Sequence, residues 1–233
     1  MKIENKEFSF EESLIFFDEL AVLMKDRKDM YVCDTMTKED LLTKDVSLVH
    51  CTVLYIKVNN QRIKDIKLKE YVYQAAMTQI VKILRSSKSL RHLDVQADGG
   101  LMALFDTPMK KEIVEVINLS AQVRSINEVV LKKFSLEPSS QTVTEGMEYG
   151  TVGCYKDDEA LEDVFFSGDG TATAKHLASA REDCVNISQS IYINLTEDMQ
   201  TKLFANEAVY QDVKYHFAPL INIRMRRWVV EGK

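Results

Sequence analysis

The 233-residue sequence is 45% hydrophobic and 28% charged, a composition typical of globular proteins that fold around a sizeable core. The formal net charge of −6 gives no overall attraction to nucleic acids or to anionic membranes. No apolar run is long enough for a membrane-spanning helix, and charged residues occupy the start of the chain, where a signal peptide needs an apolar core. We therefore expect a cytoplasmic protein that binds neither nucleic acid nor membrane.

The first 45 residues form a section distinct from the rest of the chain. Residues 8–28 carry apolar side chains at the three- and four-residue spacing of an amphipathic helix. Residues 34–45 are polar and predict a connection. We interpret residues 1–45 as an N-terminal helical extension, which either packs onto the main domain or forms a dimer arm, and residues 46–233 as the main domain.

The main domain alternates between strand and helix patterns. The first five elements are a buried strand over 48–56, a helix over 71–84, strands over 93–97 and 101–105, and a helix over 112–133. We then expect two strands flanking residues 146–155, a strand over 164–167, a helix over 171–181, a strand over 187–192, a short helix over 199–204, and closing strands over 213–217 and 221–226. This order predicts an α/β (α+β) fold, a ferredoxin-like β-α-β-β-α-β sandwich with additions.

Four segments of the main domain carry recognisable sequence patterns. The strand Cys51–Lys57 is followed by the hairpin Asp98–Pro108, by the segment Gly146–Val152, and by Ser167–Leu177, in which a Gly-Asp pair opens a helix. In order and spacing these segments resemble the VTVLFAD, GDGLMAVF, GxxxGxV and VGDxVNxAxRL segments of class III (adenylate/guanylate-type) nucleotidyl cyclase catalytic domains. The resemblance implies the fold of that family, with active sites at a dimer interface. It therefore also implies a homodimer, or a heterodimer with another cyclase-type chain.

The family closes a 3′-hydroxyl onto the α-phosphate and uses two carboxylates to hold two metal ions. The resemblance places Lys57 and Gly99 at those two positions. Lys57 either binds a phosphate directly or reaches solvent at the end of its strand. Asp98 would reach the metal position only through a bulged turn, and is otherwise a turn aspartate bonded to its own backbone. We expect no metal cofactor, with Mg²⁺ or Mn²⁺ required only if the chain is an active cyclase.

The remaining family positions are also replaced. Ala172 and His176 stand where the resemblance implies an Asn that orients the ribose and an Arg that stabilises the transition state. His176 either contacts phosphate when protonated or is an ordinary packed or surface residue. Val95 and Phe165 occupy the purine-reading positions, where Phe165 offers stacking instead of hydrogen bonds. The candidates for contact with a nucleotide are Lys57, Arg62, Val95, Phe165, Asp169 and His176.

Three functions are open at this point. The first is a pseudoenzyme, a cyclase-like domain that serves dimerisation, nucleotide sensing or partner binding. The alternative is an active cyclase that makes cyclic UMP or cyclic CMP, because the compact form and the loss of purine-reading residues resemble the bacterial pyrimidine cyclases of Pycsar antiphage defence. The third is a ferredoxin-like domain unrelated to cyclases, which a different strand order would establish.

Overall fold

The computed structural model describes residues 31–33, 46–156 and 164–231. The predicted helix over 8–28 and the predicted connection over 34–45 lie outside the described residues. The chain divides into two compact units, Met1–Tyr31 and Val32–Lys233, and the described elements belong to the second apart from the first residue of β1. None of the helices in the described ranges is long and apolar enough to cross a membrane.

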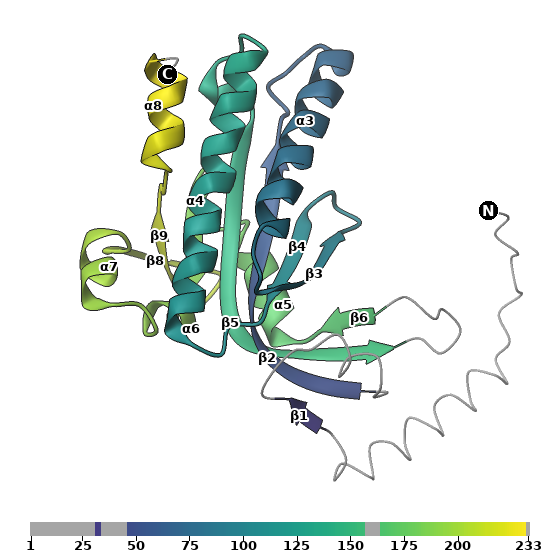
Figure 1. The fold of residues 1–233 in the computed structure, drawn as a ribbon, viewed down its shortest axis with the longest axis vertical. Helices are drawn as coiled ribbons and strands as arrows, with labels where there is room; N and C mark the ends of the chain where they lie inside the picture. Colours follow the sequence, from purple (N-terminus) through teal and green to yellow (C-terminus); the bar gives the residue numbers. More distant parts are fainter. Residues whose placement is uncertain (1–30, 34–45, 157–163, 232–233) are drawn as a thin grey trace, which may run out of the picture. The chain divides into compact units, whose positions relative to one another are not determined.

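The described strands form one mixed sheet (Figure 1). Its order is β3-β4-β2-β5-β7-β9-β8, with β1 paired to β2 and β6 paired to β5. The strands are β1 (Tyr31–Cys33), β2 (Val46–Asn59), β3 (Leu90–Val95), β4 (Leu101–Phe105), β5 (Thr142–Lys156), β6 (Val164–Ser167), β7 (Val185–Ser188), β8 (Asn206–Tyr210) and β9 (Val213–Ala218). The long strands β2 and β5 pair antiparallel along the centre. The order β3-β4-β2-β5 confirms the predicted ferredoxin-like core.

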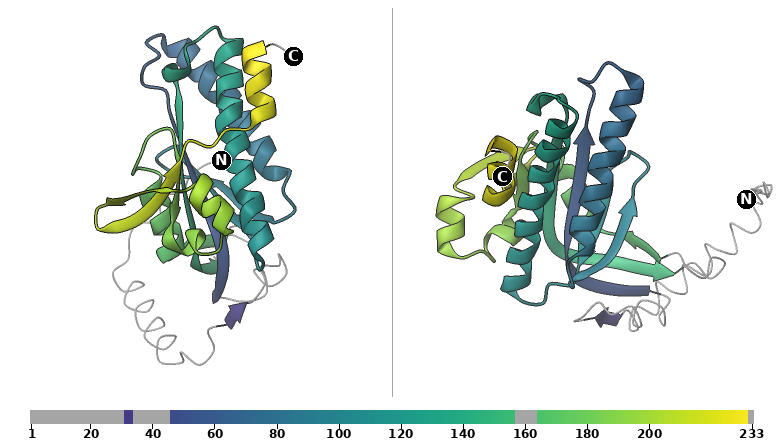
Figure 2. Two further views of the ribbon diagram at one scale, coloured as in Figure 1. Left: turned by 90° about the vertical axis from the view of Figure 1, so that its left-hand side faces the viewer. Right: turned by 45° about the horizontal axis from the view of Figure 1, so that its top comes forward.

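The helices cover the sheet unequally. They are α3 (Ile66–Arg85), α4 (Lys110–Lys133), the 3₁₀ turn η2 (Pro138–Ser140), α5 (Asp169–Leu177), α6 (Gln189–Tyr192), α7 (Glu197–Lys202) and α8 (Ile223–Glu231). Helices α3 and α4 lie side by side on one face of the sheet, as the side view in Figure 2 also shows. Leu54 and Ile56 are buried on the face with α3 and α4, whereas Val53 and Tyr55 are buried with Ala174 of α5. Because side chains alternate along a strand, β2 is buried on both faces, as its continuous apolar run predicts.

The prediction of two strands flanking residues 146–155 is wrong, because β5 runs through this segment without a break. Its glycines permit close packing and do not end the strand. A Cβ added to Gly146 would lie 2.0 Å from the Ala174 carbonyl oxygen and 2.4 Å from the Ala178 nitrogen. Gly146 therefore lets the backbone of α5 lie directly on β5.

The predicted strand over 187–192 is correct only in its first half. Strand β7 ends at Ser188, whose hydroxyl accepts a hydrogen bond from the Ile191 nitrogen at 3.3 Å. This side chain caps the N-terminus of α6. The short helix predicted over 199–204 is present as α7, two residues earlier in the chain.

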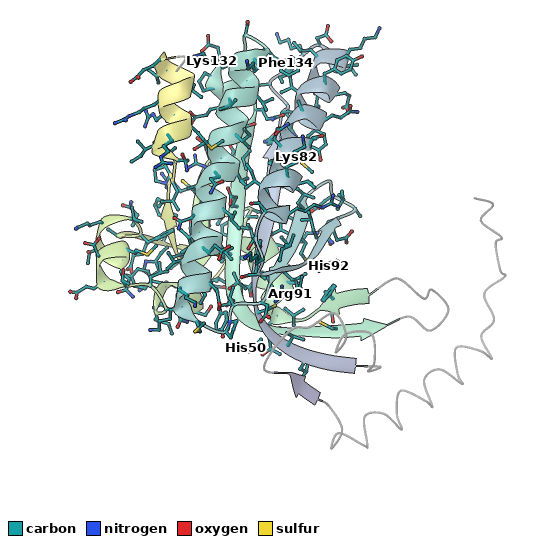
Figure 3. The ribbon with its side chains drawn as sticks, in the orientation of Figure 1. His50, Lys82, Arg91, His92, Lys132 and Phe134 are labelled. Atoms are coloured by element: carbon teal, nitrogen blue, oxygen red, sulfur yellow. The ribbon has the colours of Figure 1, made fainter. Side chains whose placement is uncertain are left out.

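The prediction of a closing strand over 221–226 is wrong, because α8 occupies most of this segment. The side-chain oxygen of Asn222 accepts a hydrogen bond from the Met225 nitrogen at 3.1 Å and starts the helix. Helix α8 lies beside α4, where the Lys132 ammonium donates to the Val229 carbonyl (Figure 3). The alternation of apolar residues with Asn and Arg over these six positions is too short to distinguish a strand from a helix.

Candidate functional site

The turn between β3 and β4 is held in an unusual conformation by two glycines. Gly99 has a φ of +79°, in the left-handed region that favours glycine. A Cβ added to Gly100 would lie 2.3 Å from the hydroxyl of Tyr55. The missing side chain of Gly100 thus makes room for Tyr55, which projects from β2 beneath the turn.

Asp98 sits at the tip of this turn and has three partners. Its Oδ1 accepts hydrogen bonds from the Tyr55 hydroxyl and, at 3.2 Å, from the Gly100 nitrogen. Its Oδ2 lies 3.0 Å from the ammonium of Lys175 on α5. Burial alone would raise the pKa of Asp98, but the hydrogen bonds from Tyr55 and Lys175 outweigh burial and lower the pKa to about 2. Asp98 is therefore ionised at neutral pH.

The bond from Gly100 to Asp98 is the one expected of a turn aspartate. The bulged alternative requires an irregularity in the turn itself, yet Val95 pairs directly with Leu101, and the register shift of the hairpin lies at its other end, between Leu90 and His92. The same contacts affect Tyr55, because burial and then its hydrogen bond to Asp98 raise the pKa of the phenol above its usual value.

A cleft of about 110 Å³ lies between the hairpin and α5. It is lined by Tyr55, Gln96, Met102, Phe166, Thr171, Ala172 and Lys175. His92 of β3 supports one wall, because its ring centroid lies 4.3 Å from that of Phe166 (Figure 3). Pockets that enclose a whole drug-sized ligand measure about 300–1,000 Å³, so the cleft of one chain accommodates only part of a nucleotide.

Of the predicted family positions, Ala172, at the ribose-orienting position, lines this cleft directly. The base-reading position Val95 is not part of the lining, which contains its neighbour Gln96 instead. The side chain of Val95 is 61% exposed, and Phe165 lies on β6 with its side chain outside the described part of the structure.

The other predicted residues lie elsewhere. His176 points to β8, where its Nε2 is 3.2 Å from the Tyr210 carbonyl oxygen and its ring packs on that of Tyr210. Arg62 donates to the Ser139 carbonyl at 3.1 Å and lines a separate cleft of about 210 Å³. Lys57 is exposed on β2. In the part of the chain that the structure describes, Lys57, Arg62 and His176 line no common cleft.

Asp169 belongs to a third cleft, of about 270 Å³, at the start of α5. It shares this cleft with Glu148, whose pKa is raised by burial although hydrogen bonds from Ser190 and Ser188 favour the charged form. Two carboxylates line this cleft, and the described ranges contain no group of three or more His, Cys, Asp or Glu side chains that could hold a metal ion.

Two residues of the Asp98 cluster, Tyr55 and Lys175, were not among those predicted from the sequence. His176 was predicted instead, and the adjacent Lys175 points about 100° away from it around the helix. The signal that identifies Lys175 is its spacing, because Thr171, Ala172 and Lys175 lie three and four residues apart and share one face of α5.

No family model and no curated protein matches the sequence. Solved cyclase structures do resemble the fold. The adenylyl cyclase CyaB from P. aeruginosa superposes with a TM-score of 0.60 at 15% identity, over 75% of this chain and 96% of that chain. A class III adenylyl cyclase-like ATP-binding protein from Pseudomonas aeruginosa superposes with a TM-score of 0.62 at 13% identity, over 88% of this chain and 47% of that chain. A dimeric guanylyl cyclase domain of the RhoGC fusion protein from the fungus Blastocladiella emersonii superposes with a TM-score of 0.58 at 12% identity. The match covers 78% of this chain and 100% of that chain.

The strand order and these neighbours show that the chain has the fold of class III nucleotidyl cyclase catalytic domains, which the four sequence segments predict. A different strand order, which would have established a ferredoxin-like domain unrelated to cyclases, is not found in the described sheet. The neighbours include both dimeric and monomeric cyclase domains.

Proposed function

We propose that this chain is a cyclase-like domain that binds a nucleotide without cyclising it, and that it acts as a nucleotide-sensing module in a homodimer or with another cyclase-type chain. The observation that carries the proposal is the set of partners around Asp98. The carboxylate at the tip of the hairpin is engaged by Tyr55, Gly100 and Lys175. Two-metal chemistry requires two available carboxylates, and the resemblance places Lys57 and Gly99 where they should stand.

The lining of the cleft supports nucleotide binding. Phe166 contributes an aromatic side chain against which a base can stack, Gln96 contributes an amide, and Lys175 contributes a positive charge for a phosphate. The small volume of the cleft supports completion by a second chain. One structural neighbour is a cyclase-like ATP-binding protein, which agrees with binding, and another is a dimeric cyclase domain.

The test is to incubate the purified protein at high concentration with ATP, GTP, CTP or UTP and Mn²⁺, and to search for cyclic products by mass spectrometry. Calorimetry on the same samples measures binding, and light scattering measures the mass with and without nucleotide. We expect binding without a cyclic product. A cyclic nucleotide that disappears in Asp98→Ala would overturn the proposal and place Asp98 at a metal ion. If that product were cyclic UMP or cyclic CMP, the chain would be the pyrimidine cyclase of the alternative hypothesis.

A further inference from the structure

We propose that Lys175 binds the phosphate of an incoming nucleotide, and that Asp98 holds Lys175 in the empty cleft and competes with the ligand for it. This inference rests on the proposed nucleotide binding. Beyond that binding, it identifies Lys175 as the residue that recognises the anion, and the contact with Asp98 as one that lowers the affinity for anions.

The position of Lys175 supports the first half of the proposal. Its ammonium lies 5.5 Å from the centroid of the Tyr55 ring, so the charge sits beside an aromatic face. Among the described residues that line the cleft, Lys175 carries the only positive charge. A phosphate attached to a base or sugar that lies against Phe166 therefore meets this ammonium first.

The exposure of the ion pair supports the second half. The side chains of Lys175 and Asp98 are 50% and 44% exposed. An ion pair that water reaches this freely is weak, because solvent screens the attraction and both side chains lose conformational freedom. A phosphate has a higher negative charge and several acceptor oxygens, so it displaces a single carboxylate from an ammonium.

Asp98 does not follow Lys175 when the pair opens. The Tyr55 hydroxyl and the Gly100 nitrogen both bond its Oδ1, while Lys175 contacts only Oδ2. Asp98 thus remains as a fixed negative charge at the edge of the cleft. It repels every anion, and only a highly charged ligand such as a di- or triphosphate compensates for that repulsion.

The experiment measures by calorimetry the affinities for ATP, GTP, CTP, UTP and inorganic tripolyphosphate, with EDTA present to remove divalent cations. Lys175→Gln should weaken binding by roughly tenfold or more, because it removes a charge-assisted bond. Asp98→Asn should tighten binding by about three- to tenfold, because it frees Lys175 and removes the repulsion. The Asn oxygen still accepts from Tyr55 and Gly100, so the turn is retained.

The matched control is the exposed ion pair between Lys214 and Glu207, with 2.8 Å between nitrogen and oxygen and side chains that are 54% and 58% exposed. Lys214→Gln and Glu207→Gln change the net charge in the same way, and both should leave the affinity unchanged. Lys175→Arg keeps the charge and should restore part of the binding. A melting curve of each variant verifies that it is folded.

The outcomes separate the two proposals. Suppose that nucleotides bind, but that the Lys175 and Asp98 variants change the affinity in the same direction or leave it unchanged. The proposed competition between Asp98 and the phosphate for Lys175 is then refuted, whereas nucleotide binding is retained. If neither the wild type nor Asp98→Asn binds any nucleotide or tripolyphosphate, nucleotide binding is wrong and the role of Lys175 is refuted with it.

Discussion

Glu145 is a carboxylate placed in the hydrophobic core, and its replacement should stabilise the protein at neutral pH. It lies on β5 between Val143 and Met147, beneath α4, and is 0% exposed. Both of its oxygens are buried without a hydrogen-bond partner in the described residues. Burial raises the pKa of Glu145 from 4.5 to about 8, although Ser120 and Arg124 favour the charged form and offset part of the effect.

The direction of the pH dependence follows from this raised pKa. Between pH 4.5 and about 8 the unfolded chain releases the Glu145 proton, whereas the folded protein retains it. Stability should therefore fall as the pH rises through this window and level off above it. The shift from 4.5 to about 8 corresponds to an upper limit of roughly 3 kcal/mol at pH 7, at about 1.4 kcal/mol per pH unit.

Glu145→Gln removes the titration and keeps the shape of the side chain. Its amide can donate to Ser120 Oγ, a buried atom that lacks a partner in the described structure. We expect a gain of about 1–3 kcal/mol at pH 7 and a rise in Tm on the order of 5 °C.

The assay is urea unfolding of the wild type and of Glu145→Gln at a series of pH values from about 5 to 9. Titration of other groups is common to both proteins and cancels in the difference between their unfolding free energies. The difference should grow up to about pH 8 and then remain constant. Glu137→Gln, at an exposed glutamate, is the control and should follow the wild type. Parallel curves for Glu145→Gln and the wild type, or a less stable Glu145→Gln at pH 7, would refute the argument.

Two further predictions test the packing of α5 and the Asp98 cluster. Gly146→Ala should destabilise the protein by several kcal/mol in urea unfolding, because its Cβ would lie 2.0 Å from the Ala174 carbonyl oxygen. Gly153→Ala, whose nearest contact is a side-chain oxygen at 3.5 Å, should cost far less. Tyr55→Phe should raise the pKa of Asp98, measured by NMR titration of its carboxyl carbon, because it removes a hydrogen bond to the charged form.

The sequence predicted the core of the fold because periodic burial determines it. Strand β2 reads as a continuous apolar run and α4 as a long amphipathic helix, and both are present. Helix α3 begins five residues before its predicted start at Tyr71, because Asp65 caps it and its first turn is exposed, with Ile66 77% exposed. An exposed helical turn shows no periodic spacing of apolar residues, so the capping residue is the only sequence signal for the start of the helix.

The errors have one cause in common, which is that local signals were interpreted without their tertiary context. The segment 146–155 was predicted to lie between two strands, although it belongs to β5 and Gly146 is where α5 approaches that strand. Asn222 and Ser188 are capping residues, and each of them lies inside a segment whose apolar residues suggested a strand. The convergence of Tyr55 and Lys175 on Asp98 depends on that same packing of α5, so periodicity in the sequence cannot reveal it.

The charge at the tip of the hairpin is paired within the chain itself. Asp98 is neutralised by Lys175 and hydrogen-bonded by Tyr55 and Gly100. Among the described residues, the buried polar atoms without partners belong to other parts of the fold, including Glu145 beneath α4. The charge of the hairpin carboxylate is thus satisfied by residues of β2, of the turn and of α5.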